Sequence, residues 1–274
     1  SGDLFSAVQS TLKRLKGAHG IVVMSSDEPD KLITARLGNA GGIAIGVGQG
    51  EMFVASDVPA IIAHTQQMAF LESGQIATIS ANGFMVQDLE GKVLKLKAQN
   101  IPWDPISAEK GNYPHFMLKE IHEQVRALSN TLSGRIDFDS SRVVLPSLNV
   151  DTESAKAIKK IFITACGTAA YAGMVGKYLI EHITRIPAEV MIASEFRYCD
   201  PIIEPGTVVL AISQSGETAD TLAAMEEARL KGAPVWAIVN AIGSQAMRIA
   251  DGGVSMQGGP EIGVASTKAF TPPT

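Results

Sequence analysis

The densest cluster of candidate ligand-binding side chains lies in one short segment, Ser213-Gln214-Ser215-Gly216-Glu217-Thr218. It follows an apolar run that predicts a strand, and it precedes a segment that predicts a helix. Gly216 would let a ligand approach the backbone, and a helix amino terminus offers free N–H groups and partial positive charge. Hydroxyl and amide groups beside that terminus would form an anion site of neutral donors, suited to a phosphate monoester. The alternative is that the Ser and Thr residues cap the helix.

Two weaker segments could contribute to the same site. Cys166-Gly167-Thr168 also stands where a strand is expected to give way to a helix, and it offers a hydroxyl and backbone N–H groups. A buried cysteine at a strand end is often only a packing residue. The stretch from Gly258 to Lys268 predicts a shaped loop whose last residues, Ser266 to Lys268, could add donors. The alternative for that stretch is an ordinary turn with a solvated lysine.

These motifs do not indicate other common chemistries. The Ser213–Thr218 segment has neither the glycine spacing and lysine of a P-loop nor the Gly-x-Gly-x-x-Gly pattern of a dinucleotide site. The five histidines show no metal-ligand spacing, and none stands where it could serve as a base for Cys166. We therefore expect no metal ion, no cofactor and no catalytic residue among these groups.

The second half of the chain alternates between expected strands and expected helices. Apolar runs predict strands at 161–165, 190–193, 208–212, 235–239 and 253–256, and helices are expected at about 171–182, 218–231 and 245–249. Buried apolar strands alternating with helices are typical of a parallel, doubly wound sheet. Such sheets bind ligands at the carboxyl ends of their strands, where the Ser213 and Cys166 segments lie.

The first half predicts an α+β architecture rich in antiparallel strands. After an opening amphipathic helix, a turn at 27–30 joins strands at 21–24 and 32–35, a loop is expected at 46–50, and strands follow at 53–55, 76–80, 84–88 and 93–96. Residues 99–145 predict a linker with one helix, from Phe116 to about Leu132. The predicted domains are therefore 1–98 and 146–274, joined by the linker 99–145.

Composition limits the partners. The chain has 274 residues, of which 46% are hydrophobic and 19% charged, which is enough for two domains with proper cores. The net charge of −5 argues against nucleic acid as a partner. No apolar run approaches the roughly 20 residues of a membrane span, so no membrane is expected. Only two cysteines and no basic, apolar leader favour a reducing, cytoplasmic location.

Longer motifs carry a resemblance to a known family, the glutamine–fructose-6-phosphate aminotransferases (isomerizing), or glucosamine-6-phosphate synthases. Ser213–Thr221 closely resembles the phosphosugar motif of that family. Further stretches resemble its sugar-isomerase part, its linker and the later part of its glutaminase domain: Ala193–Tyr198, Glu261–Phe270, Tyr113–Ile121, Ala35-Arg36, Ile45–Gly48 and Phe53–Asp57. The resemblance runs from Leu4 to about Thr271.

This resemblance implies a two-part enzyme that uses glutamine to convert fructose 6-phosphate to glucosamine 6-phosphate. It implies an α/β fold class, with an α+β partial glutaminase (Ntn-type) region followed by a doubly wound parallel-sheet sugar-isomerase (SIS) domain. The implied partners are the sugar phosphate, a second copy in a homodimer and, in the intact parent only, glutamine.

The resemblance assigns ten residues of the three motifs to the substrate. In chain order they are Cys166, Gly167, Thr168, Ser213, Gln214, Ser215, Thr218, Val264, Ala265 and Ser266. The four within 213–218 would hold the phosphate, the three at 166–168 would line the sugar, and the last three would close the site. Ala169 stands where the family usually has a serine, which would leave one phosphate donor missing.

The family's glutaminase nucleophile and second SIS domain have no counterpart in these residues. We therefore expect this chain alone to bind a sugar phosphate without converting it. Two alternatives remain: a sugar-phosphate-binding sensor, and a deglycase or isomerase of the SIS family. A sensor would carry a helix-turn-helix and a basic face, which we do not find. A deglycase would lack a glutaminase half, which residues 1–98 argue against.

Overall fold

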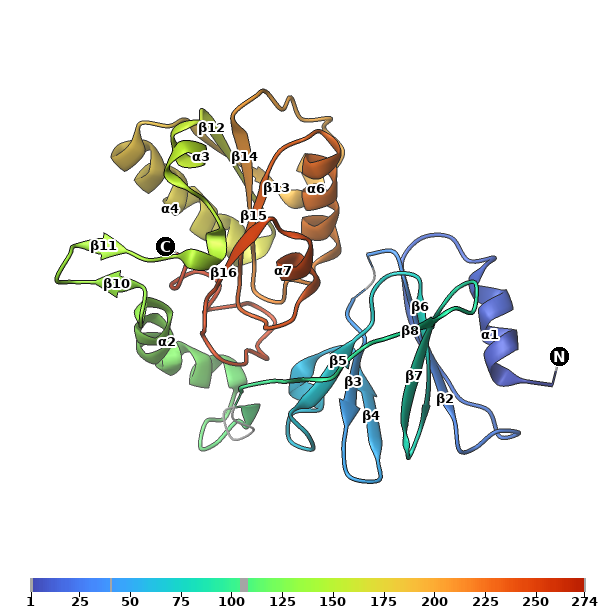
Figure 1. Cartoon of the computed structure of the whole chain (residues 1–274). Coiled ribbons are helices and arrows are strands. Elements are labelled where there is room, and N and C mark those ends of the chain that lie inside the picture. The colour runs from blue at the N-terminus through green and yellow to red at the C-terminus, as the bar shows by residue number, and fades with distance from the viewer. Residues whose placement is uncertain (1, 40, 104–107, 274) are drawn as a thin grey trace. The chain divides into compact units, whose positions relative to one another are not determined.

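The computed structural model describes residues 2–39, 41–103 and 108–273. Its contacts divide the chain into two compact units, Ser1–Glu109 and Lys110–Thr274 (Figure 1). Helix α2 (Phe116–Leu132) has the bounds that its apolar period predicts, and it belongs to the second unit. Residues 104–107 of the predicted linker lie outside the described residues.

In its described residues, the first unit contains one α-helix and two antiparallel sheets. One sheet has the order β1 (His19–Val23), β2 (Leu32–Leu37), β6 (Gln75–Ser80), β7 (Gly83–Asp88) and β8 (Val93–Leu94). The other has the order β4 (Met52–Ala55), β3 (Ala44–Val47), β5 (Gln67–Phe70) and β9 (Gln99–Asn100). Helix α1 (Leu4–Leu12) precedes them, and the 3₁₀ turn η1 (Val58–Ala60) follows β4. The predicted 21–35 hairpin is confirmed by the pairing of β1 with β2.

The first unit has three layers: helix α1, the five-stranded sheet and the four-stranded sheet. Ile33 and Ile76 point to the face covered by α1, where Leu12 packs against them. Ala77 and Ile79, on the other face, pack against Ile45 and other residues of the four-stranded sheet. The five-stranded sheet is therefore buried on both faces, because side chains alternate along each strand.

The predicted loop at 46–50 is wrong at its first two positions, since Gly46 and Val47 lie in β3. A Cβ at Gly46 would lie 2.5 Å from Cγ2 of Ile61, so the glycine permits close packing inside a strand and does not mark a turn.

The second unit is built on one parallel sheet. Its order is β13 (Ala188–Ile192), β12 (Lys160–Ala165), β14 (Thr207–Ser213), β15 (Val235–Val239) and β16 (Gly252–Ser255). The helices around it are α3 (Thr152–Lys156), α4 (Gly167–Thr184), α5 (Ala193–Phe196), α6 (Ala219–Leu230) and α7 (Gln245–Ile249). A short hairpin, β10 (Ile136–Asp137) and β11 (Arg142–Val143), and the turn η3 (Pro146–Leu148) link α2 to α3. The predicted α/β fold with a parallel sheet is confirmed.

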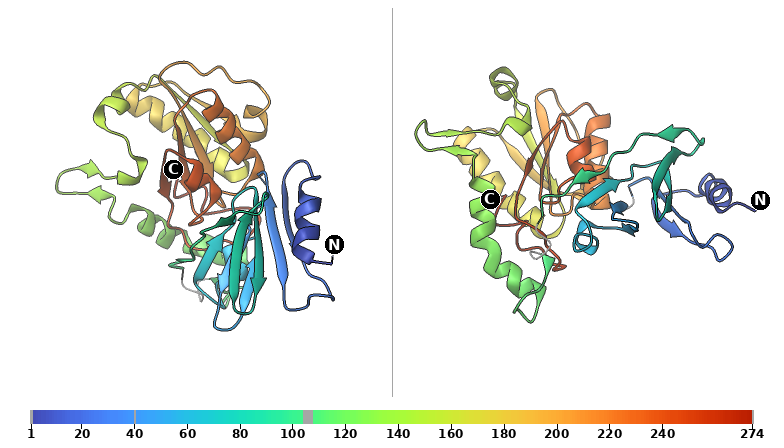
Figure 2. Two further views of the ribbon diagram at one scale, coloured as in Figure 1. Left: turned by 45° about the vertical axis from the view of Figure 1, so that its right-hand side comes forward. Right: turned by 60° about the horizontal axis from the view of Figure 1, so that its bottom comes forward.

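Helices cover both faces of this sheet, as Figures 1 and 2 show for α4 and α6. Phe162 and Val209 pack with Leu222 of α6 on one face. Ile161 and Ile163 pack with Ala170 of α4 on the other. The chain leaves β12 for one edge of the sheet and then returns past it to β14, so the order reverses between these two strands. Doubly wound sheets bind ligands at such a switch point.

The predicted start of the helix after β12 is wrong: α4 begins at Gly167, four residues before Tyr171. The segment Gly167-Thr168-Ala169-Ala170 has little apolar periodicity, and its glycine resembles a loop signal, which explains the error. The earlier start places Thr168 in the first helical turn, directly at the carboxyl end of β12.

Candidate ligand-binding site

One cavity of about 430 Å³ lies at the carboxyl ends of β12 and β14. All ten residues that the family resemblance assigns to the substrate line it. Six further residues complete the lining: Ala169, Tyr171, Ile212, Thr221, Gly263 and Ala269. The structure therefore brings the three motifs together around a single space, although they are up to about a hundred positions apart in the chain.

The turn after β14 is held by its own serines. The Ser213 hydroxyl oxygen accepts a hydrogen bond from the Gly216 N–H at 2.9 Å, and the Ser215 oxygen accepts one from the Glu217 N–H at 3.1 Å. Each hydroxyl still has its own hydrogen to donate, because an oxygen that accepts does not use its O–H. The serines can therefore shape the turn and bind an anion at the same time, so the capping and binding interpretations are compatible here.

Gly216 is required by the geometry of this turn. Its φ is +64°, and a Cβ at this position would lie 2.3 Å from the Ser244 hydroxyl oxygen. Its carbonyl oxygen accepts a hydrogen bond from the Ala246 N–H at 3.0 Å. The turn is thus packed tightly against the start of α7, which fixes the positions of Ser213 and Ser215.

Two helix amino termini meet at the cavity. Cys166 is the N-cap residue of α4 and Thr218 that of α6, and neither makes a side-chain capping hydrogen bond. Simple capping therefore does not account for the Thr218 hydroxyl. The first N–H groups of both helices and their dipoles favour negative charge at this place. Among the described residues, no Lys, Arg, His, Asp or Glu lines the cavity, so the donors in its lining are neutral groups.

The third wall is the 258–268 loop, whose residues Gly263 to Ser266 line the cavity. The Ser266 hydroxyl donates to Glu261 Oε2 at 2.7 Å and accepts from the Ala269 N–H at 3.0 Å. Lys268 is fully buried, with 0% of its side chain exposed, and its Nζ lies 2.8 Å from Glu123 Oε2. The interpretation of this stretch as a turn with a solvated lysine is therefore wrong, and Lys268 does not line the cavity either.

Sequence reasoning missed two polar residues of the lining, Tyr171 and Thr221. Each follows a predicted residue at helical spacing, Tyr171 three after Thr168 and Thr221 three after Thr218. Residues three apart share one face of a helix, so extending the two motifs by one helical turn would have found both. Ala169 is buried and lines the cavity without a polar group.

Within residues 2–39, 41–103 and 108–273, no group of three or more His, Cys, Asp or Glu side chains is placed to hold a metal ion. Every helix in the same ranges is too short or too polar to span a lipid bilayer.

Comparison with known proteins identifies the second unit's domain type. Residues 156–274 match the family model described as SIS domain. A glutamine–fructose-6-phosphate aminotransferase (isomerizing) from Symbiobacterium thermophilum is 45% identical over 98% of this chain and 44% of its own length. The corresponding protein of Corynebacterium diphtheriae is 46% identical over 98% of this chain and 42% of its own length. This chain thus spans less than half the length of these curated relatives.

A solved structure supports the same relationship. The C-terminal domain of glucosamine-fructose-6-phosphate aminotransferase from Francisella tularensis is 41% identical, with a TM-score of 0.54, over 60% of this chain and 46% of that one. The resemblance predicted from the motifs is confirmed: this chain is homologous over nearly its whole length to part of the glutamine–fructose-6-phosphate aminotransferases, and its residues 156–274 form an SIS domain.

Proposed function

We propose that the second unit binds a sugar phosphate in the cavity at the carboxyl ends of β12 and β14. The phosphate would lie at the 213–218 turn, held by Ser213, Gln214, Ser215 and Thr218. The sugar would extend toward Cys166, Gly167 and Thr168, and Val264, Ala265 and Ser266 would close the site.

The observation that carries this proposal is the meeting of two helix amino termini and several hydroxyl groups in one cavity whose described lining residues are all uncharged. A phosphate monoester is a compact anion that needs several converging donors, and helix termini supply them together with favourable dipoles. The volume of about 430 Å³ lies within the range of sites for small molecules. Neutral donors would also release the ligand more readily than a cluster of arginines.

The relatives' names suggest the reaction of the parent protein. We propose that the chain is part of an enzyme that converts fructose 6-phosphate and glutamine to glucosamine 6-phosphate and glutamate. In this view residues 1–98 belong to a glutaminase-type domain, 99–145 form a linker with one helix, and 146–274 belong to the first SIS domain. The extension of the match over the first unit supports this division. By the same resemblance we propose a homodimer, and by the two free cysteines a cytoplasmic location.

The 274 residues alone are expected not to form glucosamine 6-phosphate from fructose 6-phosphate and glutamine. Ring opening and proton transfer need an acid and a base whose pKa values lie near the working pH. Within the part of the chain that the structure describes, no His, Lys, Asp or Glu side chain lines the cavity to supply them. A product assay with the purified chain, beside a full-length relative as positive control, checks this expectation. Product formation above the enzyme-free rate would contradict it.

Calorimetric titration tests the binding site directly. We expect saturable binding of glucosamine 6-phosphate and none of glucosamine, because the neutral sugar has no anion for the two helix termini. Ser215→Ala should weaken binding roughly tenfold to hundredfold, as expected for losing one hydrogen bond to a charged group. Ser154→Ala, an exposed serine of α3 outside the cavity, serves as the matched control.

Thermal unfolding of both variants separates binding from stability in this titration. If Ser215→Ala binds like the unaltered chain while unfolding at the same temperature, the phosphate does not lie at the 213–218 turn. If the unaltered chain unfolds cooperatively but binds no sugar phosphate, the proposed function of this cavity fails.

A further inference from the structure

We infer that Glu120 of α2 is a positioning residue for the 258–268 loop and thereby sets the affinity of the cavity for its ligand. The inference rests on the proposed function, since it concerns the wall of the same site. Glu120 itself does not line the cavity, and it stands in the stretch that sequence alone assigned to a linker.

Helix α2 runs alongside the whole segment that follows β16. In its last turn, the Thr131 hydroxyl donates to the carbonyl oxygen of Met256. Three residues beyond the end of the helix, Arg135 Nη2 donates to the Ser255 carbonyl oxygen at 2.6 Å. Further back along the helix, the Thr271 hydroxyl donates to the side-chain oxygen of Gln124. These contacts make α2 the support on which the segment from Ser255 to Thr271 lies.

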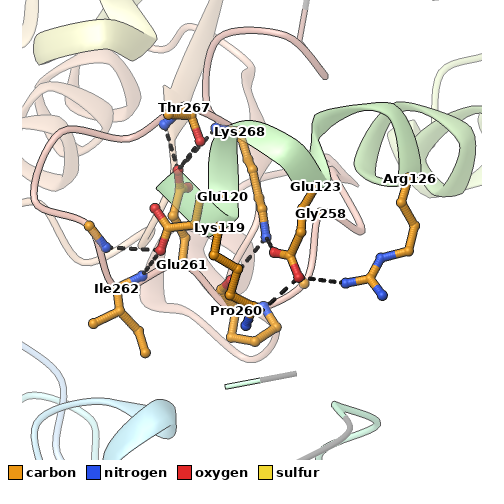
Figure 3. Close-up of polar contacts among 12 residues, drawn as sticks. Lys119, Glu120, Glu123, Arg126, Gly258, Pro260, Glu261, Ile262, Thr267 and Lys268 are labelled. Atoms are coloured by element: carbon orange, nitrogen blue, oxygen red, sulfur yellow. Dashed lines mark hydrogen bonds and ion pairs between the residues drawn. The ribbon is translucent and has the colours of Figure 1, made fainter. Parts of the chain in front are cut away.

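Glu120 binds the part of the loop that reaches the cavity. Its side chain is only 2% exposed, and its Oε1 accepts hydrogen bonds from the Ile262 N–H at 2.7 Å and the Gly263 N–H at 3.0 Å (Figure 3). Gly263 is the first of the four consecutive loop residues in the lining. One carboxylate oxygen therefore fixes the backbone just where the loop enters the site, and Val264, Ala265 and Ser266 follow from that point.

Other contacts hold the remaining parts of the loop. Asn240, at the end of β15, accepts from the Gly258 N–H at 2.9 Å and donates to the Gly259 carbonyl oxygen at 2.7 Å. Glu261 accepts from the Thr267 and Lys268 N–H groups at 2.5 and 3.0 Å. Asn240 thus anchors the start of the loop, Glu261 orders its end, and Glu120 joins the middle to α2.

A second carboxylate of α2, one turn further on, binds the end of the loop. Glu123 Oε2 lies 2.8 Å from Nζ of the fully buried Lys268, which also donates to the Pro260 carbonyl oxygen at 3.1 Å. Arg126 and Lys119 approach the other oxygen of Glu123 at 2.8 and 3.7 Å. Residues three apart share a helix face, so α2 presents two carboxylates to the loop together (Figure 3).

Gly263 lies directly against the buried Glu120 carboxylate, so a side chain at this position would have to displace that carboxylate. A Cβ there would lie 2.6 Å from Glu120 Oε2. That same oxygen has no hydrogen-bond partner among the described residues, although it is buried. Burying an unpaired carboxylate oxygen costs stability. The unpaired Oε2 therefore lowers the stability that this contact contributes. The two hydrogen bonds to Oε1 nevertheless fix the loop backbone closely against α2.

The test combines amide hydrogen exchange, measured without ligand, with titration of glucosamine 6-phosphate into the full chain. Glu120→Ala should remove the exchange protection of the Ile262 and Gly263 amides and weaken binding roughly tenfold or more, because a loop that must be ordered on binding lowers affinity. Glu120→Gln keeps an oxygen that can accept both N–H groups, so it should restore protection and most of the affinity. Glu153→Ala, an exposed glutamate of α3, is the matched control.

A second variant, Gly263→Ala, keeps the inference testable if the Glu120→Ala protein does not fold. Gly263→Ala should displace the loop from α2 through the clash with Glu120, and it should likewise weaken binding while leaving the Gly216 and Glu217 amides protected. Unchanged binding in a variant whose Ile262 and Gly263 amides have lost protection would overturn the inference, as would unchanged protection in Glu120→Ala. If the unaltered chain binds no sugar phosphate, the proposed function fails, and the exchange data alone then decide whether Glu120 positions the loop.

Discussion

Gly216→Ala should destabilise the second unit by about 2–5 kcal/mol, since a left-handed backbone costs about 1–2 kcal/mol for a residue with a Cβ and overpacking adds about 1–3. The φ of +64° provides the first term. The second arises because the new Cβ would lie 2.3 Å from the Ser244 hydroxyl oxygen and 2.7 Å from Val239 Cγ1, both on buried side chains. The carboxyl end of β15 and the start of α7 would have to move apart to admit a methyl group.

The measurement is thermal or urea unfolding, with Gly232→Ala as the matched control. Gly232 follows α6 with a φ of +82°, but a Cβ there meets nothing within 4 Å, so its substitution reports backbone strain alone. Gly216→Ala should be clearly the less stable of the two, and it should bind sugar phosphate more weakly even where it is folded. Equal stability of the two variants would show that the 213–218 turn yields to a side chain, contrary to the packing described here.

The second unit follows closely from its sequence because its local signals agree with its tertiary contacts. The apolar strands alternate with helices, and the two clusters of buried residues that pack on the faces of the sheet are apolar. Helix α2 agrees with the helix predicted from Phe116 to about Leu132, since apolar side chains repeat at helical spacing along this stretch. The Cys166–Thr168 and Ser213–Thr218 segments both lie at the switch point of the sheet. Their place could be predicted because the order of strands and helices determines which strand ends are neighbours.

Contacts between segments that are far apart in the chain could not be predicted from local sequence patterns. Glu120 and Gly263 are 143 positions apart, and nothing in the sequence near Glu120 distinguishes it from a solvated helix residue. Lys268 gave no sign that it would be buried, because a lone lysine after serine and threonine is usually exposed. The start of α4 was misplaced for a local reason: small residues such as Ala169 and Ala170 pack closely against the sheet without giving an apolar period.

Glu261→Ala should have the second large effect, on both the order of the loop and ligand binding. The Glu261 carboxylate accepts four hydrogen bonds from three consecutive residues, from the Ser266 hydroxyl at 2.7 Å, the Thr267 N–H at 2.5 Å, the Thr267 hydroxyl at 3.2 Å and the Lys268 N–H at 3.0 Å. Hydrogen bonds to charged groups contribute about 1.5–3 kcal/mol each, and those that share one acceptor do not add fully. We expect a loss of about 3–5 kcal/mol of unfolding free energy and at least tenfold weaker sugar-phosphate binding.

Glu261→Gln separates the role of the charge from that of the hydrogen bonds. Its amide oxygen can accept from Thr267 and Lys268, and its NH₂ group can donate to the Ser266 hydroxyl oxygen in place of accepting from it. This variant should therefore keep most of the stability and affinity that Glu261→Ala loses, as measured by urea unfolding and calorimetric titration. If Glu261→Gln is as damaging as Glu261→Ala, the negative charge of Glu261 is what orders the loop. If neither variant changes binding, the loop from Gly263 to Ser266 closes the cavity without contributing to affinity, and the ligand is held by the two helix termini alone.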